Sequence, residues 1–339
     1  MKTITKGKNM NNFKKVGLTA LAGSLAAVSA HAAEMTVSGA TMLTYTSEDS
    51  SEVTGNPFGM KTNLGFTASG EVNGYTVSYM QTSMDQFAGM SSARLSVDMG
   101  DMGTIAFDQG SGSGLATIDD KTPTAAEEIW DGLADSSTSG RVGAAGSSGV
   151  FNYVNTFSGV TFNGAARTGS GTKNSDGSSS GAGGNAWDFA LTASGDTMGV
   201  EGLTAGLGYG QAENGSATLT SDNDDQHMTV FANYSMGMVT AGVQMSGINK
   251  GAKASTDQEF TAWGVALNVN ENLSVSYGES EVDFLKPSAK HVTESKEGFA
   301  VAYTMGSMKI AGNRNEVSGE AGVTGASDSM TEIALSFAF

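Results

Sequence analysis

Acidic side chains gather in the stretch from Gly110 to Gly140, which interrupts a chain that otherwise alternates polar and apolar residues. One lysine, Lys121, stands among them. With Asp108, two positions before the stretch, the candidate acidic residues are Asp108, Asp119, Asp120, Glu127, Glu128 and Asp131. Acids on one side of a narrow aqueous passage, with cations on the other side, would create a transverse field that orients dipolar solutes. The alternative is a solvated acidic surface loop, and the stretch alone does not decide between them.

Four basic residues are candidates for the facing side of such a passage. Lys61 and Arg94 take polar positions in alternating segments, so their side chains lie on the face opposite the apolar ones. Arg167 has the same parity in its own segment, and Arg141 follows the acidic stretch. We expect these four residues to form the basic side.

The acidic stretch also carries the best helix signal after the N-terminal segment. Thr124 and Glu127 form a capping box, T-x-x-E, just after Pro123. Ile129, Trp130 and Leu133 follow and give a short apolar face. The pattern predicts a short helix within a long loop, and loops of this length are usually functional or disordered.

Around the stretch, apolar residues recur at every second position, which is typical of β-strands with one apolar face. The predicted strands are Met60–Phe66, Tyr75–Tyr79, Leu95–Met99, Ile105–Phe107, Val150–Thr156, Val160–Thr168, Trp187–Ser194, Leu203–Gln211, Met228–Ser235, Val239–Met245, Phe260–Val269, Leu273–Tyr277, Phe299–Tyr303, Met308–Asn313 and Met330–Phe339. Together with a strand from Glu34 onward, they number about sixteen, an even number that suits an antiparallel membrane β-barrel. Sixteen strands enclose an aqueous channel rather than a packed interior.

The connections between these strands alternate in length. Short turns such as Asn73-Gly74 and Met236-Gly237-Met238 are rich in Gly and Asn. Long polar connections lie between them, namely Gly169–Asn185, Ala212–Gln226, Gly247–Glu259, Glu279–Glu297 and Glu316–Ser327. Short turns at one end and long loops at the other are typical of outer-membrane barrels.

The last segment, Met330–Phe339, places Ile333, Leu335, Phe337 and Phe339 on one face. As an edge strand it would expose a row of hydrophobic side chains and invite aggregation. The pattern is explained if this strand pairs with the first one and closes a barrel.

The bulk composition agrees with one large all-β unit. The chain has 339 residues, with 47 Gly, 3 Pro, no Cys and a hydrophobic fraction of 39%, which is low because a barrel needs apolar residues only at alternate positions. Its formal charge of −17 repels nucleic acid, so a nucleic-acid partner is excluded.

The N-terminal residues 1–32 read as a secretory signal peptide. Lys14 and Lys15 are followed by the apolar run Val16–Ala27 and by the cleavage pattern Ala30-His31-Ala32. Met10 is an alternative start. Removing residues 1–32 takes away five lysines and no acid, which brings the charge from −17 to −22. The mature chain, 33–339, is then the barrel.

The sequence shows little sign of a catalytic or metal-binding site. There is no G-x-S-x-G motif, no credible Ser/His/Asp set and no His cluster for zinc. Asp222, Asp224 and Asp225 could ligate calcium through oxygen, but they lack the glycine and later glutamate of an EF-hand, and a solvated loop is the favoured interpretation. We expect a protein that is not an enzyme and has no cofactor.

In the order of these features, the chain resembles the general porins of Gram-negative outer membranes, and most of all the alphaproteobacterial type. The resemblance covers the whole mature chain. It implies a sixteen-stranded barrel with an inward-folded third loop, usually a homotrimer in outer-membrane lipid. It also implies that the strand ending in Phe339 is read by the barrel-insertion machinery, and that small hydrophilic solutes pass by diffusion.

The leading expectation is therefore a passive channel, with a preference for cations because acids outnumber bases. Three alternatives stay open. They are a structural or adhesive barrel with no open pore, a substrate-selective porin, and a soluble secreted β-protein that binds ligands as lectins do.

Overall fold

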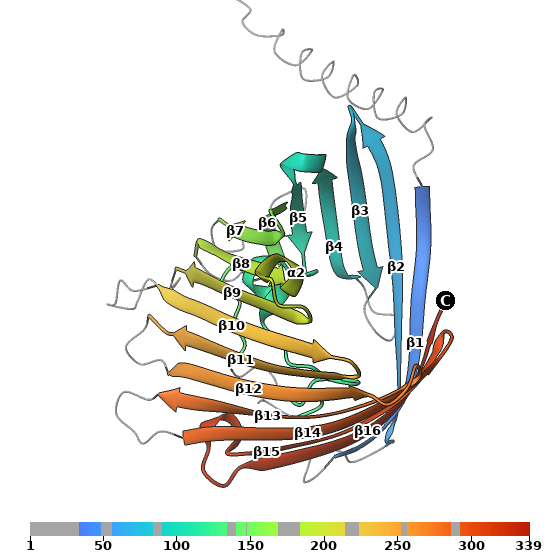
Figure 1. Ribbon diagram of the computed structural model, residues 1–339, viewed down its shortest axis with the longest axis vertical. Coiled ribbons are helices and arrows are strands. Elements are labelled where there is room, and N and C mark those ends of the chain that lie inside the picture. Colours follow the sequence, from blue (N-terminus) through green and yellow to red (C-terminus); the bar gives the residue numbers. More distant parts are fainter. Residues whose placement is uncertain are drawn as a thin grey trace, which may run out of the picture.

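The protein was analysed as a computed structural model, which describes residues 34–48, 56–83, 90–133, 140–146, 148–168, 184–213, 224–251, 256–285 and 292–339. Within these residues sixteen antiparallel strands form one closed barrel, in which each strand pairs with its chain neighbours and β1 pairs with β16 (Figure 1). The strands are β1 (Glu34–Glu48), β2 (Phe58–Val72), β3 (Tyr75–Ser83), β4 (Met90–Asp98), β5 (Thr104–Gln109), β6 (Ser148–Phe157), β7 (Val160–Arg167), β8 (Ala186–Ser194), β9 (Leu203–Ala212), β10 (Asp225–Met236), β11 (Val239–Asn249), β12 (Asp257–Asn268), β13 (Leu273–Leu285), β14 (Val292–Met305), β15 (Met308–Ser318) and β16 (Ser327–Ala338). The predicted fold class is confirmed.

The period of two in the sequence decides which side chains face out. On β12, for example, Trp263 and Val265 point outward and are exposed, whereas Ala262 and Gly264 face the interior. The outward-facing side chains form an apolar surface suited to lipid, and the Trp263 and Tyr277 rings lie 5.7 Å apart within it. At the short-turn end, Asn73 and Gly74 both have positive φ, 53° and 84°, as a two-residue hairpin turn requires.

The chain end closes the barrel. Phe339 exchanges two backbone hydrogen bonds with Gly39, of 2.8 and 2.9 Å, and Leu335 pairs with Leu43 across β16 and β1. Ile333, Phe337 and Phe339 are exposed on the outer face, as the alternation predicts. Pairing with β1 removes the open edge that this hydrophobic strand would otherwise present.

One predicted connection is largely strand instead. The sequence was read as a loop over Glu279–Glu297, but β13 continues to Leu285 and β14 begins at Val292. At this level the inward side chains are buried and of mixed type, with Val282 and Phe284 beside the Glu294–Lys296 ion pair. Acids such as Glu279, Glu281 and Glu297 take outward positions of the two strands, so the polar composition of this stretch does not mark a loop.

The remaining elements are short: the helix α2 (Gly195–Met198) and the 3-10 helices η2 (Gly100–Met102), η3 (Gly114–Ile118) and η5 (Glu320–Gly322). Nowhere in the described ranges is there a helix with the length and apolar character needed to cross a membrane. The predicted signal peptide, residues 1–32, lies outside the described residues.

Candidate functional site

The segment between β5 and β6 folds into the barrel and runs along its inner wall (Figure 1). It begins at Asp108, whose buried carboxylate accepts hydrogen bonds from the backbone amide of Ser111 (2.9 Å) and the hydroxyl of Ser113 (2.7 Å). Arg94, the cross-strand partner of Asp108, lies 4.0 Å from the same carboxylate and donates to the carbonyl oxygen of Gly112 (3.2 Å). The sequence analysis set Arg94 and Asp108 on opposite sides of the passage. In the structure they are neighbours that together fasten the start of the loop.

The first part of the loop rests on β7, β8 and β9 as the 3-10 helix η3. Leu115 and Ile118 of this helix are buried in a cluster with Ala190 and Phe231 of the wall. The Asp188 carboxylate on β8 accepts a hydrogen bond from the backbone amide of Leu115 (3.0 Å). The position of η3 is therefore set by one apolar cluster and one buried carboxylate.

The helix predicted over residues 124–133 does not form. Thr124 instead closes a turn, in which its hydroxyl donates to the carbonyl oxygen of Glu127 (2.6 Å). Side chains of the barrel wall bind the backbone of this segment instead. Ser276 accepts from the amide of Ala125 (2.8 Å), and Asn315 donates to the carbonyl oxygen of Glu128 (3.1 Å), which a helix would pair internally. The short helix that the loop carries is η3, ten residues earlier than the capping box.

The outgoing limb, residues 119–133, crosses the inner face from β10 to β16. Gln244 on β11 accepts a hydrogen bond from the backbone amide of Lys121 (2.6 Å), and Asn233 on β10 donates one to the carbonyl oxygen of Lys121 (2.7 Å). Farther along, Trp130 packs edge-on against Phe260, with ring centroids 6.0 Å apart, and Leu133 packs against Met330 of β16. Polar and apolar contacts alternate, so this limb lies flat against the wall.

The returning limb, residues 140–146, passes back over the same strands. The amide of Gly140 donates to Gln258 on β12 (2.8 Å), and that of Gly143 donates to His227 on β10 (3.4 Å). The amide of Ala145 donates to Asp188 (2.7 Å), the carboxylate that also binds Leu115. Asp188 thus holds both η3 and the returning limb.

The outgoing limb brings part of the predicted acidic side close to Lys61 of β2. Lys61 lies within electrostatic range of Asp131 and of Glu332 on β16. Burial raises the pKa of Asp131, the Glu128 carboxylate raises it further, and the Lys61 ammonium opposes both. Glu127 belongs to the same group, since it lies within electrostatic range of Glu332.

Two further predicted acids, Asp119 and Asp120, lie at the start of the outgoing limb. Burial raises the pKa of Asp119 to about 7, and the neighbouring Asp120 contributes to the rise, whereas Arg141 opposes it. Asp120 lies 3.8 Å from the ammonium group of Lys121. Asp119 is therefore a titratable group near neutral pH rather than a permanent negative charge.

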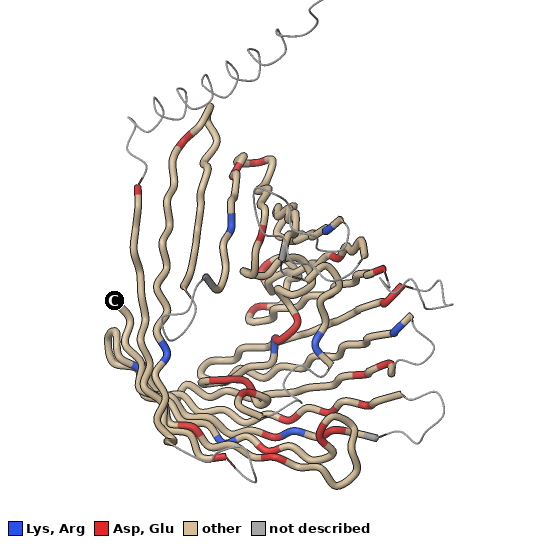
Figure 2. The backbone as a smooth tube through the Cα atoms, turned by 180° about the vertical axis from the view of Figure 1, so that it is seen from behind, with Lys and Arg blue, Asp and Glu red and all other residues tan. Residues whose placement is uncertain are grey.

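The predicted basic residues divide between the two sides. Arg141 lies within electrostatic range of Asp119 and Lys296, and Arg167 within range of Asp188, so both belong to the wall that carries the loop. Lys61 and Arg94 are the basic residues on β1–β5. Many other inward positions of that wall carry hydroxyl groups, for example Thr44, Ser78 and Ser96. Figure 2 shows acidic segments along the barrel and inside it, and fewer basic ones.

Several residues that position the loop were not singled out from the sequence. They are Asp188, Gln244, Ser276 and Asn315. Glu332, which lies within electrostatic range of Asp131, was not singled out either. The inward parity of Asp188, Gln244 and Ser276 follows from their alternation with outward apolar residues, such as Trp187 and Phe189 around Asp188. Asn315 gives no such signal, because it stands between Arg314 and Glu316. What no local pattern shows is that the loop would reach them.

The structure describes only some of the predicted calcium ligands. Asp222 lies outside the described residues. Asp225 uses one carboxylate oxygen for the Lys250 ammonium (3.1 Å) and the other for the amide of Gly251 (2.8 Å). Over the described ranges, no group of three or more His, Asp or Glu side chains is placed to hold a metal ion.

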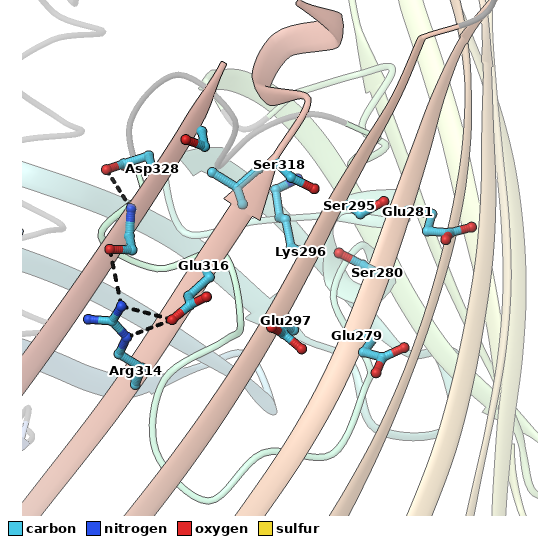
Figure 3. Close-up of a pocket in the computed structure, with 13 residues that line it drawn as sticks. Glu279, Ser280, Glu281, Ser295, Lys296, Glu297, Arg314, Glu316, Ser318 and Asp328 are labelled. Carbon is cyan, nitrogen blue, oxygen red and sulfur yellow. Dashed lines mark hydrogen bonds and ion pairs between the residues drawn. The ribbon is translucent and has the colours of Figure 1, made fainter. Parts of the chain in front are cut away.

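An acidic row lies on the outer face beside this site, around a recess of about 540 Å³ (Figure 3). Glu279, Glu297 and Glu316 are direct cross-strand partners on β13, β14 and β15. The Tyr277 hydroxyl lies 2.8 Å from a carboxylate oxygen of both Glu279 and Glu297, and the Arg314 guanidinium lies 2.8 Å from Glu316. These charges mark the level at which the lipid-facing belt ends on this side of the barrel.

Comparisons with known proteins agree with this geometry. The sequence model of the Gram-negative porin family matches residues 17–312. No curated protein sequence matches the chain.

Among solved structures, an anion-selective porin from Comamonas acidovorans is 13% identical with a TM-score of 0.62, and the alignment covers 91% of this chain and 100% of that one. A Rh. blastica porin variant is 15% identical with a TM-score of 0.61, covering 90% and 100% of the two chains. The outer-membrane protein OmpT of Vibrio cholerae, described as a trimer form, is 11% identical with a TM-score of 0.66, covering 91% and 100%. At these identities the likeness concerns the fold.

A closed sixteen-stranded barrel with an apolar outer surface and an inward loop is the architecture of an outer-membrane channel, and the family match covers most of the sequence. The chain belongs to the Gram-negative porin family.

Proposed function

We propose that this porin is a general diffusion channel for small hydrophilic solutes and ions. The passage runs between the loop, which lies along β7–β16, and the hydroxyl-rich wall formed by β1–β5. The observation that carries the proposal is the hydrogen bonding of the loop to the wall by Gln244, Ser276 and Asn315, which keeps it from crossing the lumen. A passage bounded by hydroxyl groups and scattered charges has no specific binding surface for one solute.

We further propose that the passage prefers cations. Glu127, Glu128, Asp131 and Glu332 gather near one another, and Lys61 is the basic residue among them in the described structure. Arg94 is engaged with Asp108 and the start of the loop, so part of its charge is already balanced. The net negative field favours the entry of cations over anions.

Solute uptake into liposomes tests the diffusion proposal. Vesicles that contain the purified protein should swell in sugars and amino acids at rates that fall smoothly with solute size. Swelling with one solute class alone would indicate a substrate-selective porin. Absence of swelling from folded, inserted protein would indicate a structural or adhesive barrel and would contradict the proposal.

We also propose that the chain is exported with residues 1–32 as a cleaved signal peptide, inserted by the barrel-insertion machinery through its Phe339 strand, and assembled as a homotrimer. The trimer is supported by the similar fold of Vibrio cholerae OmpT, which is described as a trimer form. Native mass spectrometry of protein extracted from outer membranes tests both points. A mass of three chains starting at Ala33 is expected, whereas a monomer or an uncleaved N-terminus would contradict the respective proposal.

A further inference from the structure

Four glycines form a row across the inner wall beneath the loop. Gly242, Gly264, Gly278 and Gly298 lie on β11, β12, β13 and β14, and each is the direct cross-strand partner of the next. Their parity is that of the loop-binding residues Gln244 and Ser276, so all four face the lumen. The row is one residue wide and four strands long.

The outgoing limb lies directly on this row. A Cβ atom at Gly264 would lie 2.7 Å from the carbonyl oxygen of Pro123, and the next two atoms it would meet also belong to Pro123. A Cβ atom at Gly298 would lie 2.6 Å from the side-chain oxygen of Asn315 and 2.8 Å from the Ile129 side chain. One at Gly278 would lie 2.9 Å from the carbonyl oxygen of Trp263 and 3.3 Å from the Ile129 side chain. Real Cβ atoms essentially never come closer than 3.0 Å, so a methyl group at Gly264 or Gly298 would require something to move.

Hydrogen bonds from side chains next to the row hold the loop against it. Lys121 and Ala125 are bound through their amides by Gln244 and Ser276, and Asn315 donates to the carbonyl oxygens of Glu128 (3.1 Å) and Asp131. The cavity left between the loop and the row is about 10 Å³, at the lower limit for a single water molecule. The limb therefore sits as close to the strands as their backbones allow.

We propose that this glycine row sets the width of the channel by fixing how far the loop stands out from the wall. Side chains on the row would displace the limb into the lumen, because the strands behind it are hydrogen-bonded on both edges and yield less than the loop. The displacement would carry Glu127, Glu128 and Asp131 toward Lys61 and narrow the passage. The inference rests on the proposed diffusion function and names the residues that limit solute size.

Single-channel conductance of the full mature protein tests the inference, with Gly264→Ala and the bulkier Gly264→Val as the variants. Gly312→Ala is the matched control, because Gly312 lies at an outward position of β15 where a Cβ atom would have its nearest neighbours at ordinary distances of 3.6 and 3.7 Å. We expect about 1.5-fold lower conductance for Gly264→Ala, a larger loss for Gly264→Val and a lower size limit for neutral polymers that enter the pore. Gly312→Ala should conduct as the parent protein does.

A single-channel step is produced only by a folded, inserted barrel, so poor folding would reduce the number of steps and not their size. Unchanged step size and polymer limit in both Gly264 variants would overturn the role of the row. A parent protein that inserts and never conducts would instead overturn the proposed function. Gly298→Ala, whose methyl group would meet Asn315 and Ile129 rather than Pro123, tests the same inference at a second point of the row.

Discussion

The Asp188 carboxylate accepts a hydrogen bond from the backbone amide of Ala145 at 2.7 Å. Its other oxygen accepts from the amide of Leu115, thirty residues earlier in the same loop. One inward-facing side chain on β8 therefore joins η3 to the returning limb of the segment that lines the channel. The position of the loop depends on this carboxylate as well as on apolar packing.

Replacing Asp188 with alanine should loosen the loop. Two buried amides would lose a charged acceptor, and hydrogen bonds to charged groups contribute roughly 1.5–3 kcal/mol each. We expect greater current noise in open single channels and a lower temperature for heat denaturation of the folded barrel. Asp188→Asn keeps one carbonyl oxygen as an acceptor, so its current noise and denaturation temperature should lie between those of the parent and of Asp188→Ala. If Asp188→Ala showed currents as quiet as those of the parent, the packing around Leu115 and Ile118 would be sufficient to hold the loop in place.

Ion selectivity should change with pH through Asp119. Its pKa is raised to about 7, mainly by burial, so the side chain becomes charged as the pH rises through neutrality. Cation preference should therefore increase between about pH 6 and about pH 8. Asp119→Asn removes the group and should flatten this part of the profile, and an unaltered profile in that variant would assign the change to another group.

The same pKa predicts the sign of a stability effect. Because the folded protein raises the pKa of Asp119 above its ordinary 3.8, its contribution to stability is complete below about pH 4 and is lost as the pH rises through about 7. Asp119→Asn should consequently gain stability relative to the parent at alkaline pH and not at acidic pH. Heat denaturation at the two ends of this range measures the difference.

Lys61→Gln should strengthen the preference for cations. Lys61 opposes the field of Asp131 and Glu332, so removing its charge leaves the acids less compensated. Arg94→Gln is an instructive comparison, because Arg94 also binds the start of the loop through Gly112 and should raise current noise as well as altering selectivity. If Lys61→Gln shifted the reversal potential toward anions or left it unmoved, the assignment of Lys61 to the passage would be wrong.

The acidic row on the outer face predicts a stabilising substitution. Glu279 and Glu297 are like charges directly opposite each other on neighbouring strands, an arrangement that costs roughly 0.2–1 kcal/mol. Glu297→Gln should raise the denaturation temperature, most clearly at low salt. Glu316→Gln is the comparison: it also relieves a like-charge pair, with Glu297, but it removes the partner of Arg314, so its gain should be smaller.

Much of the barrel could be predicted from the sequence, because strand alternation is local. The inward parity of Lys61 and Arg94, the turn at Asn73-Gly74 and the closing strand ending at Phe339 all follow from neighbouring residues. The same reasoning was wrong about the helix after Thr124. Its backbone groups are bound by Ser276 and Asn315, residues more than 150 positions away that no local signal connects to the loop.

To predict which charged residues pair, one needs the register between neighbouring strands as well as the parity within each strand. Arg94 and Asp108 become neighbours because β4 and β5 pair in one particular alignment. A shift of two residues would preserve both parities and separate the two side chains. The arrangement of charges around the passage was therefore out of reach of patterns read one strand at a time.

The measurement that tests the account most directly is the reversal potential of single channels in a planar bilayer with unequal potassium chloride on the two sides. Discrete steps whose reversal potential shows cation preference are expected, since the acids near Lys61 outnumber the bases along the passage. Discrete steps with anion preference would contradict the account of the field, and a folded, inserted barrel without steps would contradict the open channel itself.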